Sequence, residues 1–412
     1  MPEITNTNEP LSDQLDLINF TKTSWFKKKL TNPNSLIQIG TLFSGIGAVE
    51  HALKRMKINY EVLFAGDVDK KCRESYFSNY QIKEADWHSD INDFGAKKFK
   101  HKVDLLVGGS PCQAFSMVGN RQGLRDPRGS LFYEFARVVK ECRPKIFIFE
   151  NVKGLVNHDQ GATWKTMKEV FKNELKYKIN FETLNSKHYG IPQNRERIFV
   201  VGFRPDYNQP FYFPEKIQLK TTMQDFLEDC VDTKYYLREK GVKFVTRADN
   251  RKKRYTQVNG EIALCQKSNQ QFNWHGDFIF ENINEKIDFD EFVFDINPID
   301  KKYYLSEKVK KYVLSNGTKD FWIENRTDLE IARPILSSMH KMHRAGVDNY
   351  ITYNRGKIRK LTPRECHRLM GFRDSYKITV SDTAAYQQAG NSIVVDVLIA
   401  LLKEMDITKF AD

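Results

Sequence analysis

The sequence is poor in cysteine and lacks any long apolar run. Its six cysteines lie far apart along 412 residues, so neither a disulfide framework nor a CxxC zinc site is predicted, and a functional cysteine would act alone. No apolar stretch approaches the roughly 18 residues that a membrane span needs. The first fifteen residues have neither the positive start nor the apolar segment of a signal peptide. We therefore expect a cytoplasmic protein without a membrane or metal role.

The chain carries an excess of positive charge. Lys and Arg outnumber Asp and Glu by 65 to 53, which gives a net charge of +12. Such an excess suits a polyanion partner, because Lys and Arg that replace counterions on phosphates drive sequence-independent binding to nucleic acid. Many basic proteins bind nothing acidic, so composition by itself leaves the partner open.

Apolar runs and helical patterns alternate through the first half of the chain. The expected strands are 36–43, 60–65, 103–107, 145–149 and 198–203. The expected helices between them are 49–56, 131–142 and 163–175. Strands that alternate with helices are typical of an α/β fold with a parallel, doubly wound sheet.

The rhythm of strands and helices divides the chain into four segments. Residues 1–35 form a polar N-terminal extension to which we assign no chemistry, and residues 36–208 carry the alternating pattern. Residues 209–343 mix aromatics, short turns and charge clusters without a regular period, which predicts a smaller, irregular domain. Residues 344–412 form the last segment, in which a helical pattern returns after Tyr353. The length of the chain allows two or three domain-sized units.

The last segment contains a clear helix start. Thr362 suits the N-cap position, Pro363 the first helical position and Glu365 the capping-box partner of the threonine. We therefore predict a helix that begins at Pro363.

A glycine turn links the first expected strand to the first expected helix. Phe43, Gly45 and Gly47 belong to this turn, where glycine lets the backbone approach a ligand at the carboxyl edge of the sheet. Asp67 ends the next strand, where an acid can bind ribose hydroxyls. Asp90 is placed to face the same crevice from a third loop. The alternatives are a tight turn without a ligand and, for Asp90, a surface carboxylate.

A cysteine and a carboxylate follow two later strands at the same edge. The strand 103–107 runs into a glycine-bearing loop that carries Pro111 and Cys112. A thiol on a polar loop near a helix start can be activated as a thiolate nucleophile, although a lone cysteine is more often a small buried apolar residue. Glu150 follows the strand 145–149, so a carboxyl group accompanies the thiol. The alternative for Glu150 is a salt-bridged surface acid.

Two arginines precede the last expected strand. Arg195 and Arg197 are two residues apart, so they lie on one face of an extended chain. From there they could hold a phosphate or the segment around the nucleophile.

The motifs occur in a defined order between Ile39 and Val397. They are Phe43 to Gly47, Pro111 to Gln113, Glu150 to Val152, Gln193 to Arg197, Arg359 to Cys366 and Gly390 to Ser392. This series resembles the cytosine-5 DNA methyltransferase family of the bacterial restriction-modification type, with its cofactor loop, nucleophile, acid, paired-arginine, helical scaffold and last cofactor motifs. The resemblance covers nearly the whole chain, and several motifs in this order are highly specific.

The resemblance implies a Rossmann-like, S-adenosylmethionine-dependent catalytic domain and a target-recognition domain at 209–343 that acts on double-stranded DNA. Cys112 would add to C6 of a flipped cytosine, and Glu150 would stabilise charge at N3. Arg195 and Arg197 would complete the catalytic set, with Arg197 orienting the base. No metal is needed, and the spent cofactor is S-adenosylhomocysteine. The residues implied to bind the cofactor are Phe43, Gly45, Gly47, Asp67, Asp90, Ile91, Pro111, Leu131, Asn391 and Ile393.

The resemblance also implies a biological setting, and the sequence departs from the family twice. A monomer that protects DNA from a companion restriction enzyme is the default expectation, with residues 119–126 as a lid over the DNA. The target DNA sequence is not readable. Val68 stands where the family commonly has an aromatic residue beside adenine, so adenine stacking should be weaker. Ile335 stands where the family often has a threonine, and we assign it no backbone contact.

Three other readings remain. An RNA cytosine methyltransferase shares the cysteine chemistry, but the long segment 209–343 argues against it. A DNA-binding regulator without catalysis would not need Cys112, Glu150 and Arg197. A dinucleotide-dependent oxidoreductase is indicated only by the glycine turn and Asp67, and it does not explain the cysteine motif.

Overall fold

The computed structural model describes residues 24–110, 131–207, 209–228 and 357–411, with short pieces at 256–258, 276–278, 317–318, 321–322, 330–331, 335 and 350–353. The chain divides into two compact units. The sheet unit comprises Phe20–Tyr189, Glu196–Ile217 and Ser392–Asp412. The insert unit comprises Met1–Asn19, Gly190–Arg195 and Gln218–Asn391.

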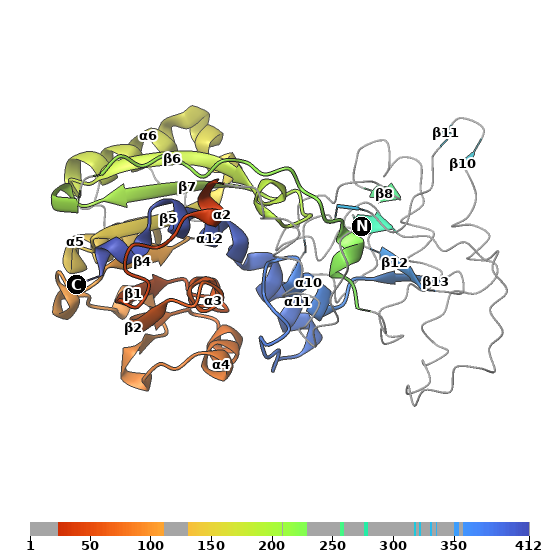
Figure 1. The fold of residues 1–412 in the computed structure, drawn as a ribbon, viewed down its shortest axis with the longest axis horizontal. Helices are drawn as coiled ribbons and strands as arrows, with labels where there is room; N and C mark the ends of the chain where they lie inside the picture. The colour runs from red at the N-terminus through yellow and green to blue at the C-terminus, as the bar shows by residue number, and fades with distance from the viewer. Residues whose placement is uncertain are drawn as a thin grey trace. The chain divides into compact units, whose positions relative to one another are not determined.

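The sheet unit is built on a seven-stranded sheet with the order β3-β2-β1-β4-β5-β7-β6 (Figure 1). The strands are β1 (Leu36–Leu42), β2 (Asn59–Gly66), β3 (Trp87–His88), β4 (Leu105–Gly108), β5 (Ile146–Val152), β6 (Lys178–Asn185) and β7 (Glu196–Phe203). Strands β1 to β5 are parallel, whereas β7 runs antiparallel to both its neighbours. The predicted α/β class is confirmed, but the sheet is mixed rather than wholly parallel.

The reversal of β7 follows from the short connection before it. Only the 3₁₀ turn Ser186–Tyr189 and residues 190–195 separate β6 from β7, whereas a parallel connection needs a dozen or more residues. The apolar residues Ile179, Phe181 and Leu184 of β6 do not keep the two-residue period of a strand. Strand β6 is therefore not recognisable from a strand period in the sequence.

The three expected helices are confirmed. The helices of the sheet unit are α2 (Ser24–Lys27), α3 (Ala48–Arg55), α4 (Lys70–Asn79), α5 (Leu131–Cys142), α6 (Ala162–Glu169) and α12 (Val395–Glu404). Helix α6 continues into a π-helical turn, Val170–Glu174, which accounts for the length of the third expected helix.

An aromatic core fills the space between the sheet and α5 with the end of α6. Phe147 and Phe149 of β5 contribute to it, together with Phe135 of α5 and Phe171 of the π-helical turn. The ring centroids of Phe135 and Phe149 are 5.0 Å apart, and those of Phe147 and Phe171 are 4.9 Å apart. Ile148, which alternates with these residues along β5, is also fully buried. Both faces of β5 are therefore covered, which holds the end of the strand in place.

The C-terminal segment is joined to the rest of the sheet unit by one buried ion pair and one buried hydrogen bond. Arg55 of α3 makes two 2.8 Å contacts with Asp396 of α12. Lys145, at the start of β5, lies 2.8 Å from Asp104 and donates to the carbonyl oxygen of Phe410 at 2.8 Å. Helix α12 and the residues after it are thus fastened to the sheet and to α3.

The described part of the insert unit contains two helices and three pairs of short strands. The helices are α10 (Pro363–Arg368) and α11 (Asp382–Asn391). The strand pairs are β8 (Thr256–Val258) with β9 (Gly276–Phe278), β10 (Gly317–Thr318) with β11 (Phe321–Trp322), and β12 (Tyr350–Tyr353) with β13 (Lys357–Lys360). The predicted helix start is confirmed, because Thr362 and Glu365 form the capping box of α10.

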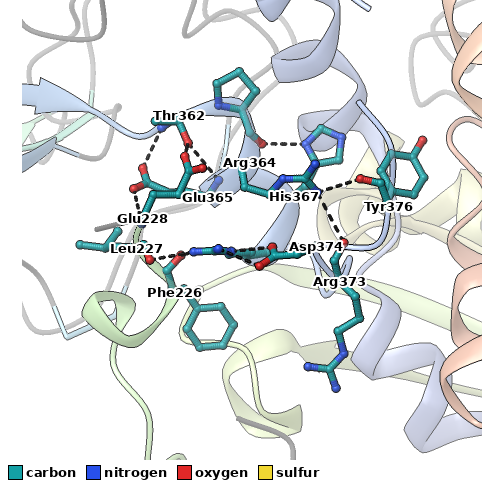
Figure 2. Close-up of polar contacts among 12 residues, drawn as sticks. Phe226, Leu227, Glu228, Thr362, Arg364, Glu365, His367, Arg373, Asp374 and Tyr376 are labelled. Carbon is teal, nitrogen blue, oxygen red and sulfur yellow. Dashed lines mark hydrogen bonds and ion pairs between the residues drawn. The ribbon is translucent and has the colours of Figure 1, made fainter. Parts of the chain in front are cut away.

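Two side chains of α10 hold the segment that ends at Glu228 (Figure 2). Glu365 accepts a hydrogen bond from the backbone amide of Glu228 at 2.8 Å. Arg368 donates to the carbonyl oxygen of Leu227 at 2.7 Å. Residues 227 and 228, which precede the stretch 229–361, therefore lie beside helix α10, which follows it.

Among the described residues, one segment has the length and composition to cross a membrane. It is Asp382–Glu404, which covers α11 and α12 and has a mean hydropathy of 1.2 in its most apolar 18-residue window. The expectation that no stretch approaches this length is therefore wrong. Because 83% of that window is buried inside the protein, the segment has the character of core helices.

Candidate active site

The glycine turn, Asp67, Glu150 and Arg197 lie at one edge of the sheet. Strands β1, β2, β4 and β5 are parallel neighbours, so their carboxyl ends meet there. The glycine turn follows β1, and the other strands end at or near Asp67, Gly109 and Glu150. Because β7 runs the other way, its first residues, with Arg197, lie at the same edge beside β5.

The two glycines of the turn have different roles. Phe43, Gly45 and Gly47 have φ angles of 52°, 53° and 78°, a region that costs a non-glycine residue about 1 to 3 kcal/mol. A Cβ on Gly47 would lie 2.2 Å from the ring of Tyr80, whereas one on Gly45 would meet only the Phe43 carbonyl oxygen at 4.0 Å. Gly47 is therefore needed for packing, whereas the space beside Gly45 is open among the described residues.

Asp67 is bound to the turn by backbone amides. Its Oδ2 accepts from the amide of Gly45 at 3.0 Å, and its Oδ1 accepts from the amide of Asp69 at 2.9 Å. Burial raises the pKa of Asp67, and the two amide hydrogen bonds oppose this rise. The carboxylate is thus oriented beside the open backbone of Gly45.

Asp90 reaches the same edge from β3, which pairs in parallel with β2. Its carboxylate accepts from the amide of Asn92 at 2.9 Å and caps the 3₁₀ turn Ile91–Asp93. The side chain of Asp90 is exposed, whereas Ile91 is buried. Its capping bond gives Asp90 a structural role, and contact with the cofactor stays a prediction for both residues.

Three further predicted cofactor residues lie at the ends of helices. Leu131 begins α5 and is half-buried, Asn391 ends α11 and is exposed, and Ile393 lies just before α12 and is half-buried. Asn391 belongs to the insert unit, and the other two belong to the sheet unit. Their relation to the glycine turn stays a prediction.

Glu150 is held from two sides. Its Oε1 lies 3.2 Å from Nε of Arg197, and the two side chains are only 12% and 14% exposed. A Cβ on Gly109 would lie 2.8 Å from Oε2, so the carboxylate can lie against the β4 loop only because residue 109 is glycine. The ion pair depends on the register of β5 and β7, which pairs Val152 with Arg197.

Asn151 anchors the loop that leads to the predicted nucleophile. Its Nδ2 donates to the carbonyl oxygen of Ser110 at 2.8 Å, and the two residues are 3% and 4% exposed. Ser110 immediately precedes Pro111 and Cys112, so this hydrogen bond positions the chain where the cysteine motif begins. Pro111 and Cys112 themselves lie outside the described residues, as does the predicted lid at 119–126.

The structure gives the two predicted arginines different partners. Arg197 pairs with the acid of β5, whereas Arg195 is 3% exposed and donates to the carbonyl oxygen of Gly390 at 2.9 Å. Gln193 donates to the carbonyl oxygen of Leu369 at 2.8 Å. Arg195 and Gln193 therefore bind the ends of α11 and α10 within the insert unit, and Arg197 belongs to the sheet unit.

Sequence reasoning missed Glu50. This residue is fully buried on α3, and its carboxylate accepts hydrogen bonds from Tyr76 and Thr41. A signal was present, because Glu50 lies one helical turn from both Ile46 and Leu53 and so shares their apolar face. A carboxylate on such a face needs a buried partner.

The described part of the site holds neither a stacking aromatic after Asp67 nor a metal cluster. Val68 follows Asp67 and is 79% exposed, so this departure lies at the surface of the site. Ile335, the second departure, is fully buried. Within the described residues, no group of three or more His, Cys, Asp or Glu side chains could hold a metal ion.

An α/β sheet with a glycine turn after one strand and an acid after the next defines a class of enzymes that bind a nucleotide-like cofactor at the carboxyl edge. The family model described as C-5 cytosine-specific DNA methylase matches residues 37–406. The chain therefore belongs to this family. The predicted activity, that of an S-adenosylmethionine-dependent DNA (cytosine-5-)-methyltransferase, is confirmed with it.

Similar proteins cover nearly the whole chain. The orphan methyltransferase M.SPRI of Bacillus phage SPR is 31% identical over 438 residues, which cover 90% of this chain and 97% of that protein. The type II methyltransferase M.HpaII of Haemophilus parainfluenzae is 32% identical over 373 residues, which cover 88% and 87%. The crystal structure of a DNMT2 mutant from Spodoptera frugiperda has a TM-score of 0.61 at 19% identity and covers 90% of this chain and 99% of its own. At that identity the structural likeness shows the fold alone.

Proposed function

We propose that this protein flips a cytosine out of a specific site in double-stranded DNA and methylates it with Cys112 as the nucleophile. The observation that carries the proposal is the hydrogen bond from Asn151 to Ser110, because it fastens the start of the cysteine loop to the strand that carries Glu150. A stacked cytosine is out of reach of a thiol, and extrusion of the base costs a few kcal/mol that contacts in the pocket return.

The reaction begins with a bond between Sγ of Cys112 and C6 of the cytosine. The electron pair of the C5–C6 double bond moves to C5, and Glu150 stabilises the charge that develops in the ring through N3. C5 then takes the methyl group and loses its proton, after which elimination of the Cys112 thiolate restores the double bond. Arg197 keeps the Glu150 carboxylate in place through the 3.2 Å ion pair and orients the base.

The residues around the glycine turn fit S-adenosylmethionine. Gly45 presents an open backbone, and the neighbouring Asp67 carboxylate keeps lone pairs for ribose hydroxyls beside its two amide bonds. When bound, the cofactor supplies an electrophilic methyl group. The further contacts that we propose are Phe43, Gly47, Asp90, Ile91, Pro111, Leu131, Asn391 and Ile393.

We further propose which segments of the chain carry catalysis and which recognise the DNA sequence. Residues 36–208 and 344–412 would form the catalytic domain, residues 209–343 would read base edges in the major groove, and residues 1–35 have no assigned role. The hydrogen bond from the Glu228 amide to Glu365 of α10 supports this assignment, because it brings together the two ends of the stretch 229–361. The net charge of +12 suits a DNA partner.

The setting that we propose is a monomer in the cytoplasm that protects DNA from a companion restriction enzyme. Support for the companion comes from relatives named type II methyltransferases, although M.SPRI is named an orphan. A cell extract that cleaves unmethylated DNA, and spares the same DNA after treatment with this protein, would support the pairing. Cleavage of both DNAs alike would contradict it.

Bisulfite sequencing tests the reaction and its target together. A plasmid of diverse sequence is incubated with the purified protein and S-adenosylmethionine, beside a Cys112→Ser control. We expect protected cytosines in one short recurring context with the native protein and none with the control. Protection by Cys112→Ser would rule out the proposed nucleophile. Loss of protection on DNA, with methyl transfer to RNA instead, would overturn the proposed substrate.

A further inference from the structure

The glycine turn rests on a buried carboxyl group that no step of the reaction uses. Glu50 is fully buried on α3, three residues after Gly47. Its Oε1 accepts from the hydroxyl of Tyr76 at 2.6 Å and from that of Thr41 at 3.1 Å. Burial raises the pKa of Glu50, and these hydrogen bonds oppose the rise. Burial of an acid in an apolar helix face costs folding free energy, which raises the question of what the Glu50 carboxyl group holds in place.

A chain of hydrogen bonds runs from Glu50 to the turn. Thr41 has one hydroxyl proton, which it donates to Glu50, so it accepts the proton of Ser44, whose Oγ lies 2.8 Å away. The Ser44 oxygen in turn accepts from the amide of Gly66 at 2.9 Å. Glu50 Oε1 is thus the terminal acceptor of the chain, and it orients the hydroxyl protons of Thr41 and Ser44.

This chain joins the ends of β1 and β2. Ser44 follows β1, and its amide also donates to the carbonyl oxygen of Gly66, the last residue of β2, at 2.9 Å. The next residue of each segment forms the 3.0 Å contact between the Gly45 amide and the Asp67 carboxylate. The spacing of the Gly45 amide and the Asp67 carboxylate therefore depends on Ser44.

We propose that Glu50 is a positioning residue for the cofactor: through Thr41 and Ser44 it holds the Gly45 amide and the Asp67 carboxylate side by side. This inference rests on the proposed cofactor site. Glutamine keeps the accepting oxygen at position 50, whereas leucine removes it and leaves the hydroxyls of Tyr76 and Thr41 without their acceptor.

The test compares Glu50→Gln with Glu50→Leu by calorimetric binding of S-adenosylhomocysteine and by steady-state kinetics. We expect Glu50→Leu to weaken S-adenosylhomocysteine binding about tenfold and to raise the KM for S-adenosylmethionine about tenfold. A tenfold change corresponds to the free energy lost with one hydrogen bond to a charged or buried group. Both kcat at saturating cofactor and the KM for DNA should change less than about threefold. Glu50→Gln should stay within about threefold of the native protein in every quantity.

A control separates positioning from stability. Arg55→Met on the same helix breaks the buried pair with Asp396, and it should lower the melting temperature without changing cofactor affinity. Native cofactor affinity in Glu50→Leu, or an equal loss in Glu50→Gln, would overturn the inference. If Glu50→Leu does not fold, Thr41→Val carries the same test, because it cuts the chain with little change of shape.

Asp67→Ala distinguishes this inference from the function on which it rests. Unchanged cofactor binding in Asp67→Ala would mean that the proposed cofactor site itself is wrong. If Asp67→Ala loses cofactor binding while Glu50→Leu and Thr41→Val bind the cofactor as the native protein does, only the positioning role of Glu50 is refuted.

Discussion

Gly109→Ala should slow methyl transfer while the protein stays folded. The added Cβ would lie 2.8 Å from Oε2 of Glu150 and 3.0 Å from its backbone oxygen, whereas an ordinary contact is 3.4–4 Å. The carboxylate would have to move by about 0.6 Å to restore that contact, and a 1 Å misplacement can cost about 100-fold in rate. We therefore expect kcat to fall about tenfold, with little change in the KM for S-adenosylmethionine.

Gly154→Ala is the matched control for this prediction. It adds the same methyl group two residues after β5, where no atom of the described residues lies within 4 Å of the new Cβ. Transfer of a radiolabelled methyl group to DNA, at saturating DNA and cofactor, measures kcat for both variants, and thermal melting reports on folding. A native rate in Gly109→Ala would refute the reasoning, and so would an equal loss in Gly154→Ala.

Two further predictions concern stability. Lys145→Met should lower the free energy of unfolding by about 3 to 5 kcal/mol, because it leaves the Asp104 carboxylate buried without its cation. Urea unfolding measures this, and a loss below about 1 kcal/mol would contradict it. His367 is buried, and burial lowers its pKa to about 4, so the unfolded chain takes up the proton first and stability falls as the pH drops from about 6.5 towards 4. His367→Gln should lose less stability between pH 7 and pH 5 than the native protein, and equal losses would count against this role.

Much of the sheet could be predicted from local patterns. The runs 36–43 and 145–149 are apolar because parallel strands are covered on both faces, and the period of α5 matches residues 131–142. Strand β6 has no such pattern, since Phe181 is 43% exposed at the edge of the sheet. The direction of β7 depends on a partner far away in the sequence, and no local period encodes it.

The sequence predicted which residue types reach the site edge, but not which of them touch. The two-residue spacing of Arg195 and Arg197 indicates one common partner. In the structure the reversed direction of β7 brings Arg197 to Glu150, whereas Arg195 donates to the carbonyl oxygen of Gly390. Such pairings depend on register between distant segments. The role of Cys112 comes from its motif and stays a prediction, because the residue lies outside the described part of the chain.

The fastening of α12 to the sheet has a consequence for synthesis. The sheet unit is interrupted in the sequence between residue 217 and residue 392. A ribosome adds about 5 to 20 residues per second, so synthesis of the intervening residues takes roughly 10 to 35 s. During that time Arg55 and Lys145 have been made, but Asp396 and the carbonyl of Phe410 have not. The nascent polypeptide therefore has all seven strands of the sheet but not helix α12, and Arg55 has no buried partner at position 396 until synthesis is nearly finished.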